Sequence, residues 1–545
     1  MSSRQARESY ADYPESMSPN MIDGRIMDEK KQHLLEAEDS NMIDGRIMDE
    51  KIQHLLEAED SYAAEDYVTI RERITRVMLF SVVMWNFLQW IDSVKQSSLQ
   101  PAGQLSGTET NPRWAHAAAE AAEEFAAYDC SGHGSVLLDT VPTNGEIVCE
   151  CHACFTGPSC AESVPDCLAQ IDSGDPVMYE YYWKQNAEAG TLVTPPWYRM
   201  SYREGMNMGT GCTLALEKQI RTLHKMVGNA AADGKILLVS SGSSPLLLSI
   251  MQALSYQKQA SYSAVAAAPF YELYRRQTDY FGDNRFAWGG DAKLFAQDPG
   301  NAGKDAMEFV TYPNNPDFRT RQPTLNGSHA HIIYDFAYYW PHMSAITREF
   351  DEDIMTFTLS KVTGHAGTRI GWGLFKDPSL AALVQMMLVT NSLGVSHDAQ
   401  ARATQLLRAV TSTYLKDNGP VPFALPAAQY AKEGRIFHYG RAVLERRYKW
   451  LEQIFAASDR FSFLKHDPEY CAFFGQTLEP SPAYAWVYCN RKEDEDCYNL
   501  FLNAGISLYR GSAYGVTDRH VRFSLLKRDS DYEVMEKYLL KLVAA

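Results

Sequence analysis

Polar and reactive side chains follow several predicted strands in the second half of the chain. Asn315 lies in the turn YPNNPD, Asp335 ends the apolar run HIIYD, and Tyr338 lies three residues beyond it. Ser360 and Lys361 end a third run, DIMTFTLSK. Ligands of α/β sheets bind outside the carboxyl ends of the strands. We therefore expect these side chains to share one site.

A Gly/Ser turn offers a place for a phosphate. The run SSGSS (240–244) contains Gly242, Ser243 and Ser244 and precedes a predicted helix. Backbone N–H groups and the positive end of a helix dipole favour an anion there. Ser360 and Arg369 could add a hydroxyl and a charge. The turn lacks the GxxxxGK[ST] pattern, so it does not indicate nucleotide binding.

One ligand would use all of these groups. Its phosphate would need the Gly/Ser turn and Arg369, and its phenolic oxygen would need Asn315 and Tyr338. Its protonated pyridine nitrogen would need Asp335, and its aldehyde would need the amine of Lys361. That ligand is pyridoxal 5'-phosphate, held covalently on the lysine. An aspartate at a strand end is more often a cap, so the ordered set carries the prediction.

The elements that position these residues alternate along the sequence. The run GKILLVSSGSSPLLLSIMQAL (234–254) predicts a strand, a turn and a helix, and similar pairs follow. This alternation predicts an α/β fold with a mostly parallel sheet. The chain has 545 residues, 45% of them hydrophobic, which is too long for one small domain. Its formal net charge of -17 argues against nucleic acid as a partner.

Six of the ten cysteines lie between Cys130 and Cys167. The dense spacing, with CECHAC followed by FTGPSC, predicts a small disulfide framework in an oxidising compartment. A zinc site is the alternative, although paired CxxC motifs would suit zinc better. Six cysteines allow 15 pairings, and their spacing alone does not choose among them.

The region before the cysteines predicts a route into that compartment. Residues 77–91, VMLFSVVMWNFLQWI, form an apolar run shorter than the ~20 residues of a typical span. The basic stretch RERITR precedes it, which favours a cytosolic N-terminus. We expect a signal-anchor or signal segment, and a buried or interfacial helix is the alternative. The sequon at Asn326 is compatible with secretion.

A tandem repeat occupies residues 20–40 and 41–61 within the N-terminal tail, residues 1–76. Two copies are too few for a solenoid. We expect a recent duplication in a tail that is disordered or helical, and a small coiled-coil or docking element is the alternative. Residues 92–113 have the composition of a linker.

The sequence resembles the plant alliinase and tryptophan-aminotransferase-related family. The resemblance rests on motifs spread over residues 114–545: WYRMSY, APFYELYRRQTDYF, YPNNPD, YDFAYYWPH, DEDIMTFTLSKVTGHAGTRIGW and SPAYAWVYCNRKEDEDCY. It implies an EGF-like module at 114–167 and a catalytic domain at 168–545. The implied fold is the fold-type-I, aspartate-aminotransferase-like fold of pyridoxal-phosphate enzymes, with large and small subdomains. Phe318 departs from the pattern, because a glycine usually follows NNPD.

The resemblance also implies roles for individual residues. Lys361 would bind the cofactor and then move protons at the substrate α-carbon. Tyr271 would stack on the cofactor ring, with a core tyrosine as the alternative, and Arg522 would bind the substrate carboxylate bidentately. Ser173 and Gly174 would lie near the substrate.

The resemblance further implies an assembly and a disulfide pattern. Tyr202 would reach the cofactor of a partner subunit, which makes a homodimer expected. The implied pairs are Cys130–Cys149, Cys151–Cys160, Cys154–Cys167 and Cys489–Cys497, with Cys212 and Cys471 free.

Two reactions fit the same residues. Transfer of the amino group of L-tryptophan or a similar amino acid to a 2-oxo acid is the reaction we favour. Cleavage of S-alkyl-cysteine sulfoxides by a carbon–sulfur lyase is the alternative. An inactive binding or storage protein is a remote third reading, which the intact Lys361 and Asp335 oppose. The expected location is the secretory pathway, as the lumen of the endoplasmic reticulum, the vacuole or the extracellular space, with anchoring through residues 77–91 left open.

Overall fold

The computed structural model describes residues 114–137, 147–202, 206–207, 211–258, 261–282, 285–416 and 423–544. The predicted tail, tandem repeat, apolar segment and linker therefore lie outside the described residues. Within the described ranges, none of the helices has the length and apolar character that a membrane span requires.

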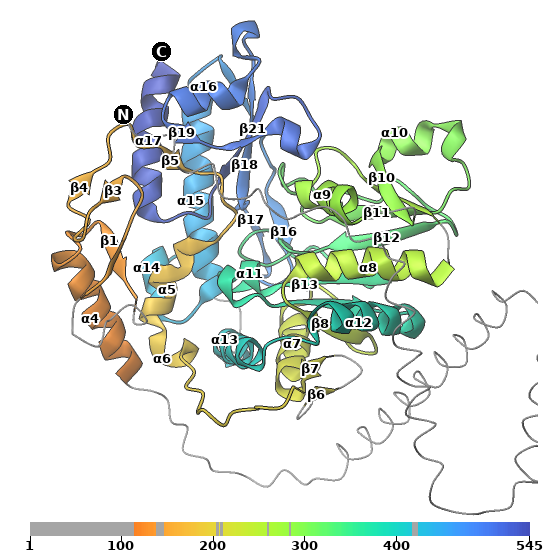
Figure 1. The fold of residues 1–545 in the computed structure, drawn as a ribbon. Helices are drawn as coiled ribbons and strands as arrows, with labels where there is room; N and C mark the ends of the chain where they lie inside the picture. The colour runs from red at the N-terminus through yellow and green to blue at the C-terminus, as the bar shows by residue number, and fades with distance from the viewer. Residues whose placement is uncertain are drawn as a thin grey trace, which may run out of the picture. The chain divides into compact units, whose positions relative to one another are not determined.

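A seven-stranded sheet lies at the centre of the larger subdomain (Figure 1). In spatial order its strands are β10 (Phe286–Asp291), β9 (Tyr262–Ala266), β11 (Ala306–Thr311), β12 (Ala330–Asp335), β13 (Ile354–Thr358), β14 (Gly371–Phe375) and β8 (Ile236–Ser240). The first five run parallel, and β14 runs antiparallel to both of its neighbours. The predicted α/β fold with a mostly parallel sheet is confirmed.

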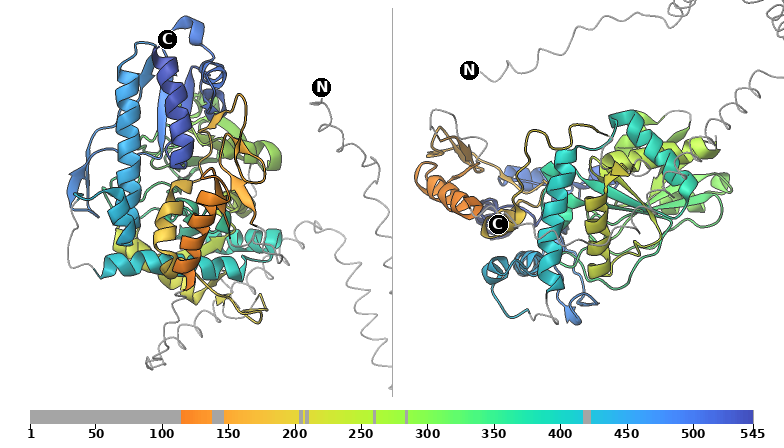
Figure 2. Two further views of the ribbon diagram at one scale, coloured as in Figure 1. Left: turned by 90° about the vertical axis from the view of Figure 1, so that its left-hand side faces the viewer. Right: turned by 90° about the horizontal axis from the view of Figure 1, so that it is seen from below.

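Helices cover both faces of this sheet (Figures 1 and 2). The helices α8 (Ser243–Lys258) and α12 (Pro378–Ser392) pack on one face, and α7 (Leu214–Val227) and α13 (His397–Leu415) pack on the other. Strand β8 shows why. Its Leu238 packs in the core beneath α8 and α12, and its Leu237 and Val239 pack in the core beneath α7 and α13. Successive side chains of a strand point to opposite faces, and each buried leucine contributes about 2 kcal/mol.

Capping residues mark the ends of α7. The Thr213 side chain accepts a hydrogen bond from the Leu216 N–H, and Gly228 ends the helix in the left-handed region. The cap satisfies one of the N–H groups that the first turn leaves without a helical partner. The cap and the glycine thus set where this sheet-covering helix begins and ends.

A smaller subdomain contains a four-stranded antiparallel sheet. Its strands, in spatial order, are β15 (Phe461–Phe463), β18 (Tyr484–Cys489), β21 (His520–Ser524) and β20 (Tyr509–Arg510). The long helix α15 (Ile436–Ala456) and the C-terminal helix α17 (Asp529–Ala544) lie beside it (Figure 1). Their buried side chains join the core that covers one face of the large sheet. This shared core orients the two subdomains.

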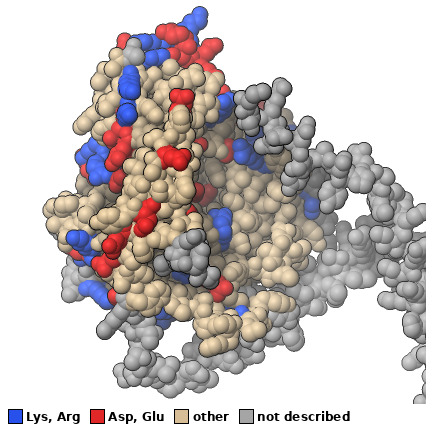
Figure 3. All heavy atoms as spheres, turned by 60° about the vertical axis from the view of Figure 1, so that its left-hand side comes forward, with Lys and Arg blue, Asp and Glu red and all other residues tan. Residues whose placement is uncertain are grey.

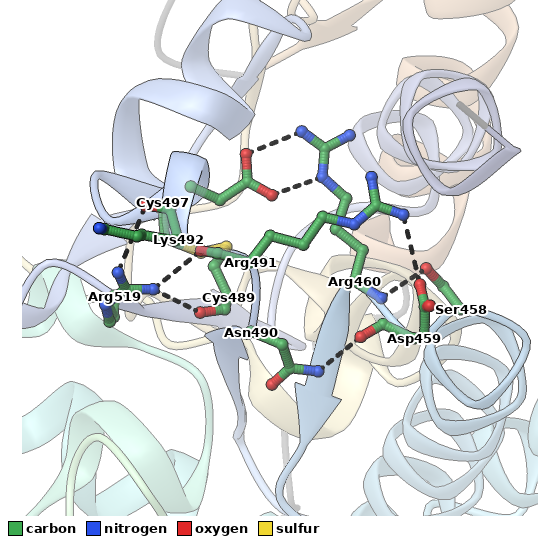
Figure 4. A network of polar contacts seen from close by, with 10 residues as sticks. Ser458, Asp459, Arg460, Cys489, Asn490, Arg491, Lys492, Cys497 and Arg519 are labelled. Carbon is green, nitrogen blue, oxygen red and sulfur yellow. Dashed lines mark hydrogen bonds and ion pairs between the residues drawn. A yellow bond between two sulfur atoms is a disulfide. The ribbon is translucent and has the colours of Figure 1, made fainter.

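A disulfide and a set of polar contacts hold the outer end of β18 (Figure 4). Cys489 is bonded to Cys497, and the Arg519 guanidinium donates to the Cys489 carbonyl oxygen at 3.2 Å. Arg460 donates two hydrogen bonds to Asp494, at 2.6 and 2.8 Å. Bidentate arginine–carboxylate pairs are among the stronger polar contacts. They fix the chain that leads from β18 toward β21.

The cysteine-rich region forms a separate small module. It begins with the helix α4 (Trp114–Tyr128) and continues through the short strands β1 (Gly134–Val136), β2 (Cys149–Cys151), β3 (Phe155–Thr156) and β4 (Glu162–Ser163). The structure joins Cys130 to Cys149, Cys151 to Cys160 and Cys154 to Cys167. These are the pairs that the resemblance implied, and they leave none of the six thiols for zinc.

The module also contacts the rest of the chain. Glu123 of α4 forms an ion pair with Lys184 of α5 (Glu180–Gln185). Cys212 and Cys471 are free and buried.

Acidic and basic side chains are interspersed over the face of the molecule shown in Figure 3.

Candidate active site

A cavity of about 380 Å³ lies where the carboxyl ends of the large sheet meet the small subdomain. Thr311, Asp335 and Thr358, the last residues of β11, β12 and β13, line one side of it. Tyr484 and Arg522 line it from β18 and β21 of the small subdomain. The predicted residues among its lining are Ser173, Gly174, Ser243, Ser244, Tyr271, Asn315, Asp335, Tyr338, Ser360, Lys361, Arg369 and Arg522.

Lys361 lies on α11 (Leu359–Val362), a single turn that follows β13 directly. The hydroxyl of Thr358 accepts a hydrogen bond from the Ser360 N–H at 3.2 Å and thereby starts this turn. The Lys361 ammonium donates to the Gly174 carbonyl oxygen and lies 5.8 Å from the centre of the Tyr338 ring. Nζ is therefore held inside the cavity by groups from two distant parts of the chain.

Asp335 is a buried carboxyl group at the end of β12, 3% exposed. The Tyr274 hydroxyl donates to Oδ2 at 2.9 Å, and the Ala337 N–H donates to Oδ1 at 3.1 Å. Burial raises its pKa to about 6, and these hydrogen bonds and Lys361 oppose that rise. Asp335 could therefore form an ion pair with a cationic ring nitrogen, because few other cations lie near this buried carboxyl group.

Replacing Asp335 by asparagine tests this burial in the cofactor-free protein. The pKa in the folded state lies above that of the unfolded chain, so the folded protein binds the extra proton between about pH 4 and pH 6. Its stability therefore falls as the pH rises through that window. The variant avoids this loss and should be more stable at pH 7 by up to about 3 kcal/mol, with little difference below pH 4.

Chemical denaturation at pH 4 and pH 7 measures this difference. Asp233→Asn, at an exposed position, is the matched control. An Asp335→Asn effect of equal size at both pH values would contradict the role of burial, because a purely steric effect does not depend on protonation.

A chain of hydrogen bonds links the two sides of the cavity. The Asn315 amide donates to the Tyr338 oxygen at 3.3 Å, and the hydroxyls of Tyr338 and Tyr484 lie 2.9 Å apart. Arg522 donates to Asn315 Oδ1 at 3.0 Å and to the Asp172 carbonyl oxygen. Its Nε has no hydrogen-bond partner in the described structure. A buried donor of this kind fits a ligand carboxylate.

The other end of the cavity has the features of a phosphate cradle. Gly242 has φ +98°, and a Cβ built there would lie 2.4 Å from Arg369 Nη2. Only glycine permits both that backbone and the close approach of the guanidinium. Ser243 and Ser244 begin the sixteen-residue helix α8, and the Ser360 hydroxyl accepts a hydrogen bond from Thr358 at 3.0 Å. The positive helix end and Arg369 thus face the same space.

The structure also places Tyr271, Tyr202 and Asn326. Tyr271 is half-buried, lines the cavity and packs edge-on against Tyr274. Tyr202 is 53% exposed and does not line this chain's cavity. Asn326 is exposed in the loop before β12.

Profiles of known families match two consecutive parts of the chain. The profile described as the alliinase EGF-like domain matches residues 113–167, and the profile described as Allinase matches residues 169–543. The chain belongs to the Allinase family. This result confirms the resemblance and the fold class expected from it.

Curated relatives in the family carry two kinds of name. Tryptophan aminotransferase-related protein 3 of Arabidopsis thaliana is 38% identical over 437 residues, which cover 80% of this chain and 92% of the relative. Alliin lyase 1 of Allium sativum is 36% identical over 438 residues, which cover 79% and 87%. A multiple substrate aminotransferase from Thermococcus profundus aligns in structure with a TM-score of 0.49 at 13% identity, over 70% of this chain and 92% of that one.

Pyridoxal phosphate fits the residues that this Allinase-family chain brings together. Lys361 offers the amine, Asp335 offers a buried acid, and the turn at Gly242 with Arg369 offers the anion cradle. The residues that could hold the cofactor thus come from the end of β12, from α11, from the turn before α8 and from the segment between α11 and β14. Their order in the sequence was the signal that predicted them.

The structure adds residues that the sequence did not indicate. Tyr274 holds Asp335, and its oxygen also lies 2.6 Å from the Thr311 hydroxyl. Tyr484 stacks on Arg522, whose guanidinium carbon lies 4.0 Å from the ring centre. Tyr274 stands one helical turn after Tyr271, a spacing that could have flagged it. Tyr484 carried no such local signal.

Proposed function

We propose that this chain is a pyridoxal-phosphate enzyme acting on L-amino acids, and that it is an aminotransferase. The observation that supports this most is one cavity containing a reachable amine, a buried carboxyl group and a buried guanidinium: Lys361, Asp335 and Arg522. Its substrates are an amino acid such as L-tryptophan and a 2-oxo acid. The similarity to a tryptophan aminotransferase-related protein supports this choice.

The bound cofactor supplies an electron sink for the charge that proton removal leaves at the substrate α-carbon. The residues of the chain bind and orient. Arg522 binds the substrate carboxylate, and Asp335 keeps its negative charge beside a cationic ring nitrogen. Asn315 and Tyr338 orient the ring, and Lys361 removes and returns the proton at the α-carbon.

A carbon–sulfur lyase is the second candidate. The 36% identity with alliin lyase 1 favours it. Lys361 would take the α-proton in both reactions. The two reactions differ in their products. A transaminase moves the amino group to a 2-oxo acid, whereas the lyase releases a sulfenic acid from the β-carbon and yields pyruvate and ammonia.

A product assay on the purified chain, loaded with pyridoxal phosphate, distinguishes the candidates. We expect L-tryptophan and pyruvate to give indole-3-pyruvate and L-alanine. An S-alkyl-cysteine sulfoxide in a separate reaction should give no pyruvate. The reverse pattern would establish the lyase, and the absence of both products with no visible absorbance of bound cofactor would indicate a binding protein.

We further propose a homodimer in the secretory pathway. Exposed Tyr202 would contribute to the partner's site, and four disulfides require an oxidising compartment. Tyr202→Ala should weaken cofactor binding without unfolding the chain, which equilibrium dialysis measures. An unchanged dissociation constant would argue against a shared site.

A further inference from the structure

A second cavity, also of about 380 Å³, lies next to the catalytic one. Its lining comes from the turn after β11, from the segment between β12 and β13, from α15 and from the segments between β15 and β18. Phe318 lies between the two cavities. It lines the second one and packs its ring edge-on against Tyr338 and Tyr484 of the first, at 5.7 and 6.4 Å.

Phe318 takes the backbone conformation that a glycine would suit. Its φ is +57°, and its side chain is 6% exposed. A bulky residue in the left-handed region is strained, and the surrounding packing must hold it there. Phe318 therefore preserves the backbone turn that the usual glycine would form, and its ring separates the two cavities.

The lining of the second cavity includes a buried guanidinium that forms no ion pair with the described carboxylates. Arg441 of α15 is 2% exposed. Its nitrogens donate to two backbone carbonyl oxygens, those of Glu479 and, at 3.5 Å, Pro341. Its Nε has no partner, and the ion pairs of the described residues include none with Arg441. Burial lowers the pKa of Arg441 to about 10, and the nearby carboxylates of Glu445 and Glu479 oppose that shift, so the group remains charged at neutral pH.

Two hydroxyl groups of the same lining also lack partners. The oxygens of Ser344 and Ser481 are buried and form no hydrogen bond in the described structure. Buried polar groups are almost always paired, so three orphaned groups in one cavity indicate something that pairs with them. A cation and two hydroxyls match an anion that accepts several hydrogen bonds.

The rim selects among anions. Arg319 and Lys465 are exposed there, and so are Asp467, Glu469 and Glu479. Three carboxylates disfavour a doubly charged phosphate more than they disfavour a single negative charge. The apolar side chains of Phe318, Met343 and Leu478 suit a short hydrocarbon chain beside that charge.

We infer that this second cavity binds a small monocarboxylate through Arg441, Ser344 and Ser481. The site is distinct from the catalytic cavity, and it shares only the Phe318 wall with the aromatic pair Tyr338 and Tyr484.

Calorimetric titration of the full-length chain, loaded with pyridoxal phosphate, tests the inference with propionate as the probe. The Arg522→Met background removes the carboxylate partner expected in the catalytic cavity. In this background we expect one propionate to bind per chain, in the second cavity. Its affinity should become about tenfold weaker after Ser481→Ala or Ser344→Ala. Ser249→Ala is the matched control, because Ser249 is another buried serine without a hydrogen-bond partner and lies on α8, outside this cavity.

Arg441→Gln should abolish binding, and the serine variants keep the test decisive if that variant does not fold. Three results would overturn the inference: no heat of propionate binding, binding that both serine variants leave unchanged, or a preference for inorganic phosphate over propionate. Because binding is measured without turnover, these outcomes are independent of whether the enzyme is a transaminase or a lyase.

Discussion

Lys361→Ala is expected to reduce turnover of every amino-acid substrate by about four orders of magnitude or more. Lys361 provides the side-chain amine of the described cavity lining, and the same amine must serve both for covalent attachment and for proton transfer. A water molecule cannot supply the nitrogen that covalent attachment of the cofactor aldehyde requires. Steady-state assays with L-tryptophan, and with the cysteine sulfoxide if that is the substrate, measure the loss.

Lys361→Arg separates charge from reactivity. Arginine keeps the positive charge near Tyr338, but its guanidinium stays protonated and is a poor nucleophile. We expect it to be as inactive as the alanine variant, with both variants losing cofactor on extended dialysis. Thermal unfolding should show that both remain folded. Turnover above about one per cent of the parent rate in either variant would contradict the role of Lys361.

Arg522→Met should lower kcat/KM for L-amino acids by about 100- to 1,000-fold. Arg522 is 4% exposed and already donates to Asn315 and Asp172, so its position is set before a substrate arrives. Methionine keeps most of the volume and removes the charge. Most of the effect should appear in KM, because the carboxylate contact is made in the ground state as well as in the transition state.

An amine without a carboxylate provides the control for this variant. Tryptamine lacks the group that Arg522 binds, so Arg522→Met should change its slow turnover little. A lysine at this position would keep the charge but lose the two-point geometry, and we expect it to recover only part of the activity. Equal losses for L-tryptophan and tryptamine would show that Arg522 acts through the fold and not through the substrate.

Several functional groups could be predicted because their signals are local. Lys361 follows a strand-like run, Asp335 ends another, and the Gly/Ser turn precedes a helix within one short segment. The alternation of strands and helices predicted the parallel sheet. A parallel sheet brings the carboxyl ends of its strands to one edge, so the order of residues in the chain was enough to group them.

Other features depend on contacts between segments far apart in the sequence. Arg522 meets Asn315 across 207 positions, and Tyr338 meets Tyr484 across 146. Periodicity describes only near neighbours, so it cannot show which strand of the small subdomain faces the large one. The same limit applies to Arg441 and the two serines of the second cavity, which share no motif.

The sequence by itself indicated the candidate reactive groups and predicted the mostly parallel sheet and the family of this protein. The tertiary structure decided how the small subdomain closes the site, which tyrosines support Asp335 and Arg522, and that a second polar cavity lies behind Phe318. The physical reason is that hydrogen bonding and burial are properties of the folded arrangement. Whether Arg441 has a counter-ion, or Asp335 a raised pKa, depends on every segment that packs around it.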